Sequence, residues 1–129
     1  MKHLTSPPLK TVLLVDTLDH SRIALKWFLG NFGYVVDSVR SGEEALAVFD
    51  PSIHDLVVTD NQMTGMNGAE MAHVIKMRSP VTPVVMYATT IPQDRSCLDS
   101  AVGKLSSPVQ DHMLLLKEAM DKLLSVAIE

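Results

Sequence analysis

The chain has 129 residues, of which 47% are hydrophobic and 20% charged, and its formal net charge is −4. These values are typical of one soluble globular domain, and the excess of acids argues against direct binding of nucleic acid, which depends on Lys and Arg. The single Cys97 excludes an intramolecular disulfide and favours a cytoplasmic protein. No apolar run approaches the ~20 residues that cross a bilayer, so we expect no membrane contact.

Strand-like and helix-like segments alternate from residue 11 onward. The apolar run TVLLV (11–15) predicts a buried strand and ends in Asp16. A helix is predicted over HSRIALKWFLGNF (20–32), with Gly33 as its C-terminal stop and Trp27 in the core. Its apolar positions are Ile23, Ala24, Trp27, Phe28 and Phe32.

The middle of the chain repeats this alternation. YVVDSV (34–39) predicts a second strand. SGEEALAVF (41–49) predicts a helix that opens with a capping box formed by Ser41 and Glu44. The third strand, LVVT (56–59), is as uniformly apolar as the first, which indicates a sheet covered on both faces.

Asp60 ends this third strand and is followed by a glycine-containing turn. A helix is predicted over 68–78, because it stops before Ser79-Pro80. A fourth strand is predicted over 83–87, a short helix over 91–101 and a brief last strand over 103–105. An amphipathic helix is predicted over 110–127, with Leu115, Ala119 and Leu123 recurring every four residues.

Spacing along the chain also predicts the surroundings of the methionines and histidines. Met71, Met77 and Met120 stand at helical spacing and are interpreted as core or half-buried. The five histidines show no metal-ligand spacing and are interpreted as surface residues; they are at positions 3, 20, 54, 73 and 112.

Five β-then-α units predict one doubly wound α/β domain over 11–129, after a tail of residues 1–10. We expect a five-stranded parallel sheet in the flavodoxin-like (βα)5 strand order 2-1-3-4-5. In that order the first and third strands flank the point where the winding reverses, at the edge where ligands bind. Asp16 and Asp60 should therefore face each other across one crevice.

Two facing carboxylates favour a hard divalent cation such as Mg²⁺, which offsets their repulsion. An aspartate neutralised in this way can attack a phosphoryl group and form an aspartyl phosphate. The alternative, on spacing alone, is that either acid caps the following helix or forms a local ion pair.

The segments VLLVD, DLVVTDNQMTGMNGAEM and TPVVMYAT, with Arg22 early in the first helix, resemble the receiver domain of bacterial two-component response regulators. The resemblance implies that Asp60 is the phosphoacceptor and that Asp16, Asp60 and the Gln62 carbonyl bind Mg²⁺. It implies a histidine kinase or phosphotransfer protein as partner, an output domain or target protein, and a monomer or weak homodimer.

The chain departs from the family pattern in its site. Thr17 replaces the second of two acids, Ala88 replaces a Ser or Thr, and Ser107 replaces a lysine before Pro108. Thr64 also stands where the family has proline. Asp19 could substitute for the acid if the loop bends inward, although an Asp there is more often a helix cap. Thr89 could supply the hydroxyl after a small loop shift, and Lys104 the cation if its side chain points toward the crevice. We therefore expect weak Mg²⁺ binding.

Three functions follow from these residues. The first is a phosphorylated signalling switch rather than an enzyme. The second is a pseudo-receiver, a protein-interaction module that keeps the fold without phosphorylation. The third is a small hydrolase with Asp16 as nucleophile, but such enzymes need an acid two residues later, where this chain has Leu18. A flavin-binding module is disfavoured, because the loop after the first strand carries acids where phosphate would bind.

Overall fold

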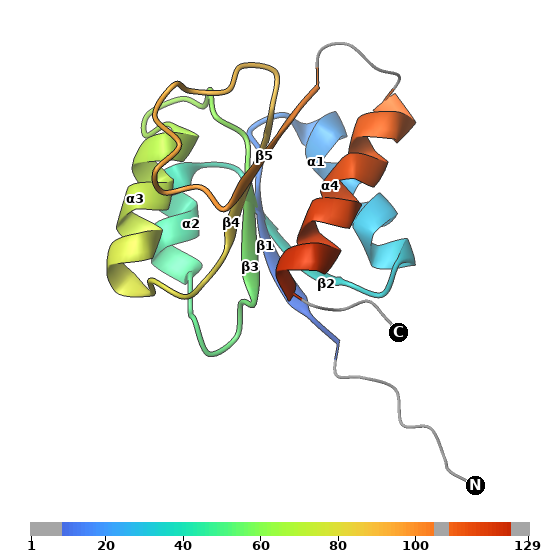
Figure 1. Ribbon diagram of the computed structural model, residues 1–129, viewed down its shortest axis with the longest axis horizontal. Coiled ribbons are helices and arrows are strands. Elements are labelled where there is room, and N and C mark those ends of the chain that lie inside the picture. Colours follow the sequence, from blue (N-terminus) through green and yellow to red (C-terminus); the bar gives the residue numbers. More distant parts are fainter. Residues whose placement is uncertain (1–8, 105–108, 125–129) are drawn as a thin grey trace, which may run out of the picture.

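The fold is a parallel sheet between two layers of helices, seen in a computed structural model that describes residues 9–104 and 109–124 (Figure 1). Within those residues the chain forms five strands and four helices. The strands are β1 (Thr11–Val15), β2 (Val35–Val39), β3 (Leu56–Thr59), β4 (Val84–Ala88) and β5 (Ser100–Gly103). The helices are α1 (Asp19–Asn31), α2 (Gly42–Val48), α3 (Gly68–Arg78) and α4 (Val109–Leu124).

All five strands are parallel and lie in the order β2-β1-β3-β4-β5, which confirms the predicted topology. The three central strands are almost entirely buried, as their unbroken apolar sequences predict. The edge strands β2 and β5 instead mix buried and exposed residues. Apolar sequence therefore distinguishes the centre of this sheet from its edges.

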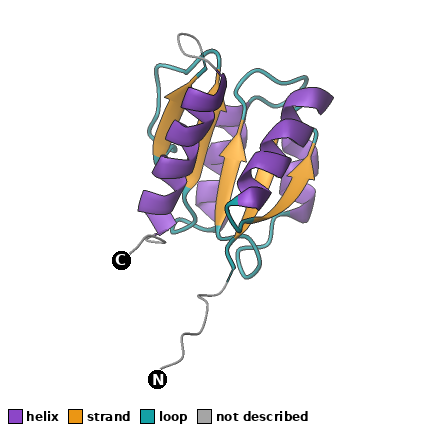
Figure 2. Cartoon of the chain, turned by 90° about the vertical axis from the view of Figure 1, so that its right-hand side faces the viewer, coloured by secondary structure: helices purple, strands orange, loops and turns teal. Residues whose placement is uncertain are grey.

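Each face of the sheet has its own hydrophobic core, and side chains alternate between them along each strand. Val12 and Leu14 face α1 and α4, whereas Leu13 and Val15 face α2 and α3. Figure 2 shows helices in front of and behind the sheet. This double cover leaves the strand ends as the places where polar side chains of the central strands reach solvent.

The predicted short helix over 91–101 is wrong. Residues 89–99 form turns and bends, and β5 begins at Ser100, before the predicted 103–105. Pro92 and the hydrogen bond from the Ser96 amide to Asp94 favour turns over a continuous helix. Leu98 and Cys97 pack from this loop onto the α2 and α3 core. The connection between β4 and β5 thus covers the sheet without a helix.

The apolar stripe of α1 was assigned to the wrong face. Trp27 is 74% exposed and Ile23 63% exposed, while Leu25 and Leu29 are buried beside Arg22. The helix is apolar on more than one side, so spacing alone could not identify the buried one. In α4 the predicted stripe is correct in part, because Ala119 and Leu123 pack against the core whereas Leu115 is exposed. Met77 of α3 is exposed, which corrects its assignment as core or half-buried. Met71 and Met120 are core, as predicted.

Two of the histidines are buried, which corrects their assignment to the surface. The ring of His54 bonds to Asp37 at 2.9 Å and accepts from the Asp50 amide at 3.1 Å. His112 of α4 meets the Tyr87 hydroxyl at 2.6 Å. His20 and His73 are exposed, and His3 lies outside the described residues, as does most of the predicted tail of residues 1–10. No helix among the described residues combines the length and apolarity needed to cross a membrane.

Candidate functional site

Asp16 and Asp60 both lie at the carboxyl edge of the sheet, directly after the neighbouring strands β1 and β3, as predicted. β1 and β3 are neighbours with Val15 opposite Thr59, so the two acids follow paired residues. The Asp60 amide donates to the Val15 carbonyl at 3.0 Å, which extends the ladder to the acid itself. The strand pattern therefore determines the placement of both carboxylates.

The loop after Asp60 is fixed by a very close backbone approach. A Cβ on Gly68 would lie 2.0 Å from the Asp60 carbonyl oxygen, and the Gly68 amide donates to the Asn61 carbonyl at 2.9 Å. Glycine is required here because a side chain would collide with backbone. Directly before it, Asn67 caps α3 in a reciprocal capping box with Glu70. The helix start thus anchors the segment that carries the acid.

A second attachment holds the middle of this loop. The Glu43 carboxylate accepts from the Met66 amide at 2.9 Å, and this bond is the main cause of its lowered pKa. The left-handed φ of +80° at Gly65 turns the chain toward that contact. α2 therefore holds the loop in place over the end of β3.

The Asp60 carboxylate is half-buried and has only one described hydrogen bond, from the Asn61 amide at 2.7 Å. Burial raises the pKa of this carboxyl above its ordinary value, and the negative charge of Asp16 adds to the rise. The Asn61 amide and the Lys104 ammonium act in the opposite direction. A carboxylate can accept about four hydrogen bonds, so Asp60 keeps free acceptor capacity.

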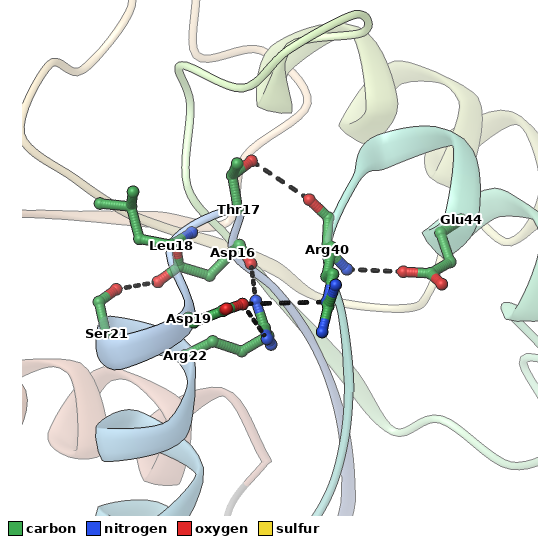
Figure 3. A network of polar contacts seen from close by, with 8 residues as sticks. All are labelled: Asp16, Thr17, Leu18, Asp19, Ser21, Arg22, Arg40 and Glu44. Atoms are coloured by element: carbon green, nitrogen blue, oxygen red, sulfur yellow. Dashed lines mark hydrogen bonds and ion pairs between the residues drawn. The ribbon is translucent and has the colours of Figure 1, made fainter.

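Asp16 has a different environment (Figure 3). It is only 3% exposed, and its carboxylate accepts from the Leu18 amide at 3.0 Å and from the Ser21 hydroxyl. Its carbonyl accepts from Arg22 at 3.0 Å. Asp16 thus ties the β1 loop to the first turn of α1, the local role that spacing alone had left open.

Asp19 does not supply the missing acid. Its carboxylate accepts from Arg22 at 2.6 Å and lies 3.9 Å from Arg40, as Figure 3 shows. The hydrogen bond from Arg22 is the main cause of its lowered pKa. Asp19 is also the first residue of α1, and the residue before it, Leu18, makes no side-chain cap. Asp19 therefore forms an ion pair with Arg22 at the start of α1.

An open hollow of about 540 Å³ lies over Asp60, and Thr17 and Gln62 are among its lining residues, whereas Asp16 is not. The oxygens facing it are of the hard type that Mg²⁺ prefers, and Asp60 has free lone pairs, so the site fits this cation. It supplies little charge, because Thr17 replaces an acid. Among the described residues, no three His, Cys, Asp or Glu side chains are grouped to hold a metal.

The ends of β4 and β5 complete the edge. Ala88 is buried and has no hydroxyl, and the exposed Thr89 is not among the residues lining the hollow. Lys104 follows β5 directly, its amide donates to the Ala88 carbonyl at 3.1 Å, and its charge lowers the pKa of Asp60. The strand ends at Gly103, not at 105 as predicted. Ser107, the position aligned with the family lysine, lies outside the described residues.

Asn61 is a site residue that sequence reasoning missed. Its side-chain amide donates to the Thr90 carbonyl at 3.3 Å and so joins the loops after β3 and β4. Its Oδ1 is the one buried side-chain oxygen among the described residues that lacks a hydrogen-bond partner. The sequence signal that could have identified Asn61 is a polar residue directly after a strand-end acid. Sequence reasoning also missed Asn67 and Glu70, although their spacing is that of a capping box.

Comparison with known proteins places this site in a family. The model of the response regulator receiver domain matches residues 12–107. Among curated proteins, the chain is 37% identical over 75 residues to the autoinducer 1 sensor kinase/phosphatase LuxN of Vibrio campbellii, which covers 58% of this chain. It is 33% identical over 75 residues to the regulatory protein VanRB of Enterococcus faecalis, again 58% of this chain. The matched regions span 9% of LuxN and 34% of VanRB.

Solved structures agree. The response regulator TrrA of Thermotoga maritima, in complex with Mg²⁺-BeF, is 30% identical with a TM-score of 0.78, over 89% of this chain and 99% of that one. The complex of the histidine kinase ThkA with TrrA gives 31% identity and a TM-score of 0.77, over 90% and 99%. With a family model that matches most of its length, two acids at the carboxyl edge and the strand order of the fold, the chain belongs to the response regulator receiver domains of two-component signalling.

Proposed function

We propose that this receiver domain is a phosphorylation switch in which Asp60 accepts a phosphoryl group from the phosphohistidine of a histidine kinase or phosphotransfer protein. The observation that supports this best is the environment of the Asp60 carboxylate, which has one described hydrogen bond and opens into the hollow. Asp16, in contrast, is buried and bonded by two donors. Asp60 is the acid with lone pairs available for reaction.

In the proposed transfer, a carboxylate oxygen of Asp60 attacks phosphorus and forms a P–O bond. The P–N bond of phosphohistidine breaks, and the imidazole nitrogen keeps the electron pair. Lys104, whose charge already acts on Asp60, would donate a charge-assisted hydrogen bond to a phosphoryl oxygen. Mg²⁺, held by Asp60 and the Gln62 carbonyl, would offset the negative charge of the phosphoryl oxygens.

The partner in this proposal is supported by a relative. The Thermotoga structure joins a histidine kinase to a response regulator that is 31% identical to this chain. We extend this to a domain of residues 11–129 that passes the phosphorylation state to an output domain or a target protein. The long relatives, of which the chain spans only a small part, are consistent with a receiver as one module among several.

The second candidate is the pseudo-receiver, and specific residues favour it. Thr17 lines the hollow where the family has an acid, and Ala88 offers no hydroxyl. Both changes weaken stabilisation of added phosphoryl charge. We therefore expect Asp60 of the wild type to be phosphorylated slowly, and Asp60 of the double variant Thr17→Asp/Ala88→Thr to be phosphorylated faster.

The test is phosphoryl incorporation measured by intact mass, with acetyl phosphate and Mg²⁺. We expect one phosphoryl group on the wild type, none on Asp60→Asn, and no change for Asp111→Asn, an exposed acid of α4. Labelling that persists in Asp60→Asn would place the acceptor elsewhere. If neither the wild type nor the double variant is labelled, by acetyl phosphate or by a phosphorylated histidine kinase, the pseudo-receiver is the correct function.

A further inference from the structure

A second hollow, of about 260 Å³, lies between α1 and α4 on the face of the sheet whose core contains Tyr87. Figure 1 shows these two helices side by side on that face. The hollow shares no described lining residue with the one over Asp60, so it is a separate place on the molecule. Pockets for drug-sized ligands occupy about 300–1,000 Å³. This hollow therefore suits a smaller molecule.

One polar group of its wall is buried and has only one of its two ring nitrogens in use. His112 is 5% exposed, and its Nδ1 lies 2.6 Å from the Tyr87 hydroxyl. Burial is the main reason that the pKa of Tyr87 rises to about 12, so this hydroxyl keeps its proton at neutral pH. A buried hydroxyl needs an acceptor, and Nδ1 is the one acceptor beside it among the described residues, so Nε2 carries the ring hydrogen. Because the ring lines the hollow and Nε2 has no described partner, this N–H is available to a ligand there.

Lys104 adds a positive charge to the same wall. Its ammonium lies 4.6 Å from the centre of the Tyr87 ring and forms no ion pair with a described residue. His20 is a further lining residue that can carry positive charge. No described Asp or Glu lines the hollow, and the Asp16 carboxylate, whose charge acts on Tyr87, is bonded to the Ser21 hydroxyl. The polar part of the wall thus favours an anion.

The rest of the wall is apolar, with Leu25 and Ala24 from α1 and Met113 from α4. We propose that this hollow binds a small organic carboxylate, whose headgroup accepts from the Lys104 ammonium and the His112 Nε2–H while its apolar body packs on Leu25 and Met113. A carboxylate can accept from two donors at once, and hydrogen bonds to a charged acceptor are about twice as strong as neutral ones. A fully polar anion such as inorganic phosphate leaves the apolar wall without a partner.

The probe is benzoate, titrated into the full chain without Mg²⁺ and followed by NMR. We expect saturable shifts of the His112 ring and of the Met113 methyl group, and none at the Asn61 amide beside the acid site. Benzamide has the same shape without the charge, and we expect it to bind at least about tenfold more weakly. Acetate and inorganic phosphate, which have the charge without the apolar body, should also bind more weakly than benzoate.

Variants of the two donors test the assignment of the headgroup. Lys104→Met should weaken benzoate binding at least about tenfold, because it removes a charged donor. The matched control is Lys117→Met: Lys117 also lies over an aromatic ring, that of Phe32 at 4.8 Å, but it does not line the hollow. This control should change the affinity by less than about twofold, the small effect of a distant surface charge.

His112→Asn separates the two nitrogens of the ring. An asparagine oxygen can take the place of Nδ1 as acceptor for the Tyr87 hydroxyl, but the side chain has no donor at the position of Nε2. We expect binding about threefold or more weaker, the loss of one hydrogen bond. Urea unfolding of each variant shows that the fold persists. The half-buried Lys104 side chain keeps the test decisive if His112→Asn fails to fold.

Four results would overturn the inference. They are no saturable shift at His112 and Met113 with millimolar benzoate, a shift at the Asn61 amide instead, benzamide or phosphate binding as tightly as benzoate, and an equal loss of affinity in Lys104→Met and Lys117→Met. The inference does not use phosphorylation of Asp60. Absence of phosphoryl incorporation would therefore overturn the proposed function and leave the carboxylate site as it stands.

Discussion

Asp16 and Asp60 directly follow two neighbouring buried strands, yet the two acids differ in burial and in the hydrogen bonds that their carboxylates accept. Asp16 is buried and bonded to the Leu18 amide and the Ser21 hydroxyl. Asp60 is half-buried, bonded to one amide and open to a hollow. The comparison teaches that the loop after a strand-end acid decides whether its oxygens are paired within the protein or remain free to accept further bonds.

The difference arises in the residues that follow each acid. After Asp16 the chain enters α1 within three residues, so the first turn of the helix reaches back to the carboxylate. After Asp60 a longer loop passes over the site before α3 begins at Gly68. The loop is held by Gly68 and by the Glu43 bond to Met66, neither of which occupies the Asp60 oxygens.

The largest effect is expected at Gly68, which sets the path of the second loop. Gly68→Ala places a methyl group 2.0 Å from the Asp60 carbonyl, so the loop or helix must move. We expect a loss of about 3 kcal/mol or more in the free energy of unfolding. Urea denaturation measures it. The control is Gly30→Ala in α1, where nothing lies within 4 Å and alanine should stabilise the helix by up to about 1 kcal/mol. Equal effects at both glycines would contradict the close approach.

The second effect separates the two acids by stability. Asp16→Ala removes the acceptor for the Leu18 amide and the Ser21 hydroxyl, and we expect a loss of about 1–2 kcal/mol, as for other helix-start acceptors. Asp60→Ala should lower the free energy of unfolding by less. It removes one hydrogen bond, from the Asn61 amide, but it also removes the cost of half-burying a negative charge. Thermal or urea unfolding of the two variants, measured side by side, shows which substitution lowers the free energy of unfolding more. A greater loss for Asp60→Ala would reverse the roles assigned to the two loops.

The same two loops show which features of the fold and of the site the sequence could predict. The strands, their order and the placement of the two acids at one edge of the sheet were predictable, because apolar runs and parallel topology determine them. The burial of Trp27 was predicted wrongly, since α1 has apolar residues on more than one side. The pairing of Asp16 with Ser21, and the placement of Lys104, depend on tertiary geometry that a pattern of residue types does not contain.

The third effect concerns Thr17, which stands where other receiver domains have a second acid. Thr17 lines the hollow with Asp60, so Thr17→Asp puts a second carboxylate beside a bound cation. We expect Mg²⁺ affinity to rise about tenfold or more, equivalent to ~1.4 kcal/mol. Titration followed by the Asn61 amide shift measures this. Asp16→Asn should change the affinity far less, since its carboxylate is bonded within the loop. If Asp16→Asn lowers the Mg²⁺ affinity by as large a factor as Thr17→Asp raises it, Asp16 contacts the ion.

The smallest effect is a difference in pH dependence between two acids with opposite pKa shifts. Burial raises the pKa of Asp60 in the folded protein, so the unfolded chain loses this proton at lower pH than the folded one. Stability from this group therefore falls as pH rises from the unfolded pKa of ~3.9 through the higher folded value. An asparagine side chain does not titrate, so the Asp60→Asn variant does not lose this stability. Its free energy of unfolding relative to wild type should therefore increase between pH ~3.9 and the folded pKa of Asp60. The gain should be small, because the group is half-exposed and solvent screens its charge.

Asp19 provides the opposite sign. Its pKa is lowered, chiefly by the hydrogen bond from Arg22, so its contribution is present above the unfolded pKa and is lost as pH falls through the folded one. Asp19→Asn should therefore become less stable relative to wild type as pH rises toward the unfolded pKa of ~3.9, whereas Asp60→Asn gains as pH rises above that value. Urea midpoints at several pH values measure both slopes. Parallel curves for wild type and Asp60→Asn would mean that Asp60 is as well solvated as an unfolded aspartate. The contrast between the raised pKa of half-buried Asp60 and the lowered pKa of ion-paired Asp19 would then have no basis.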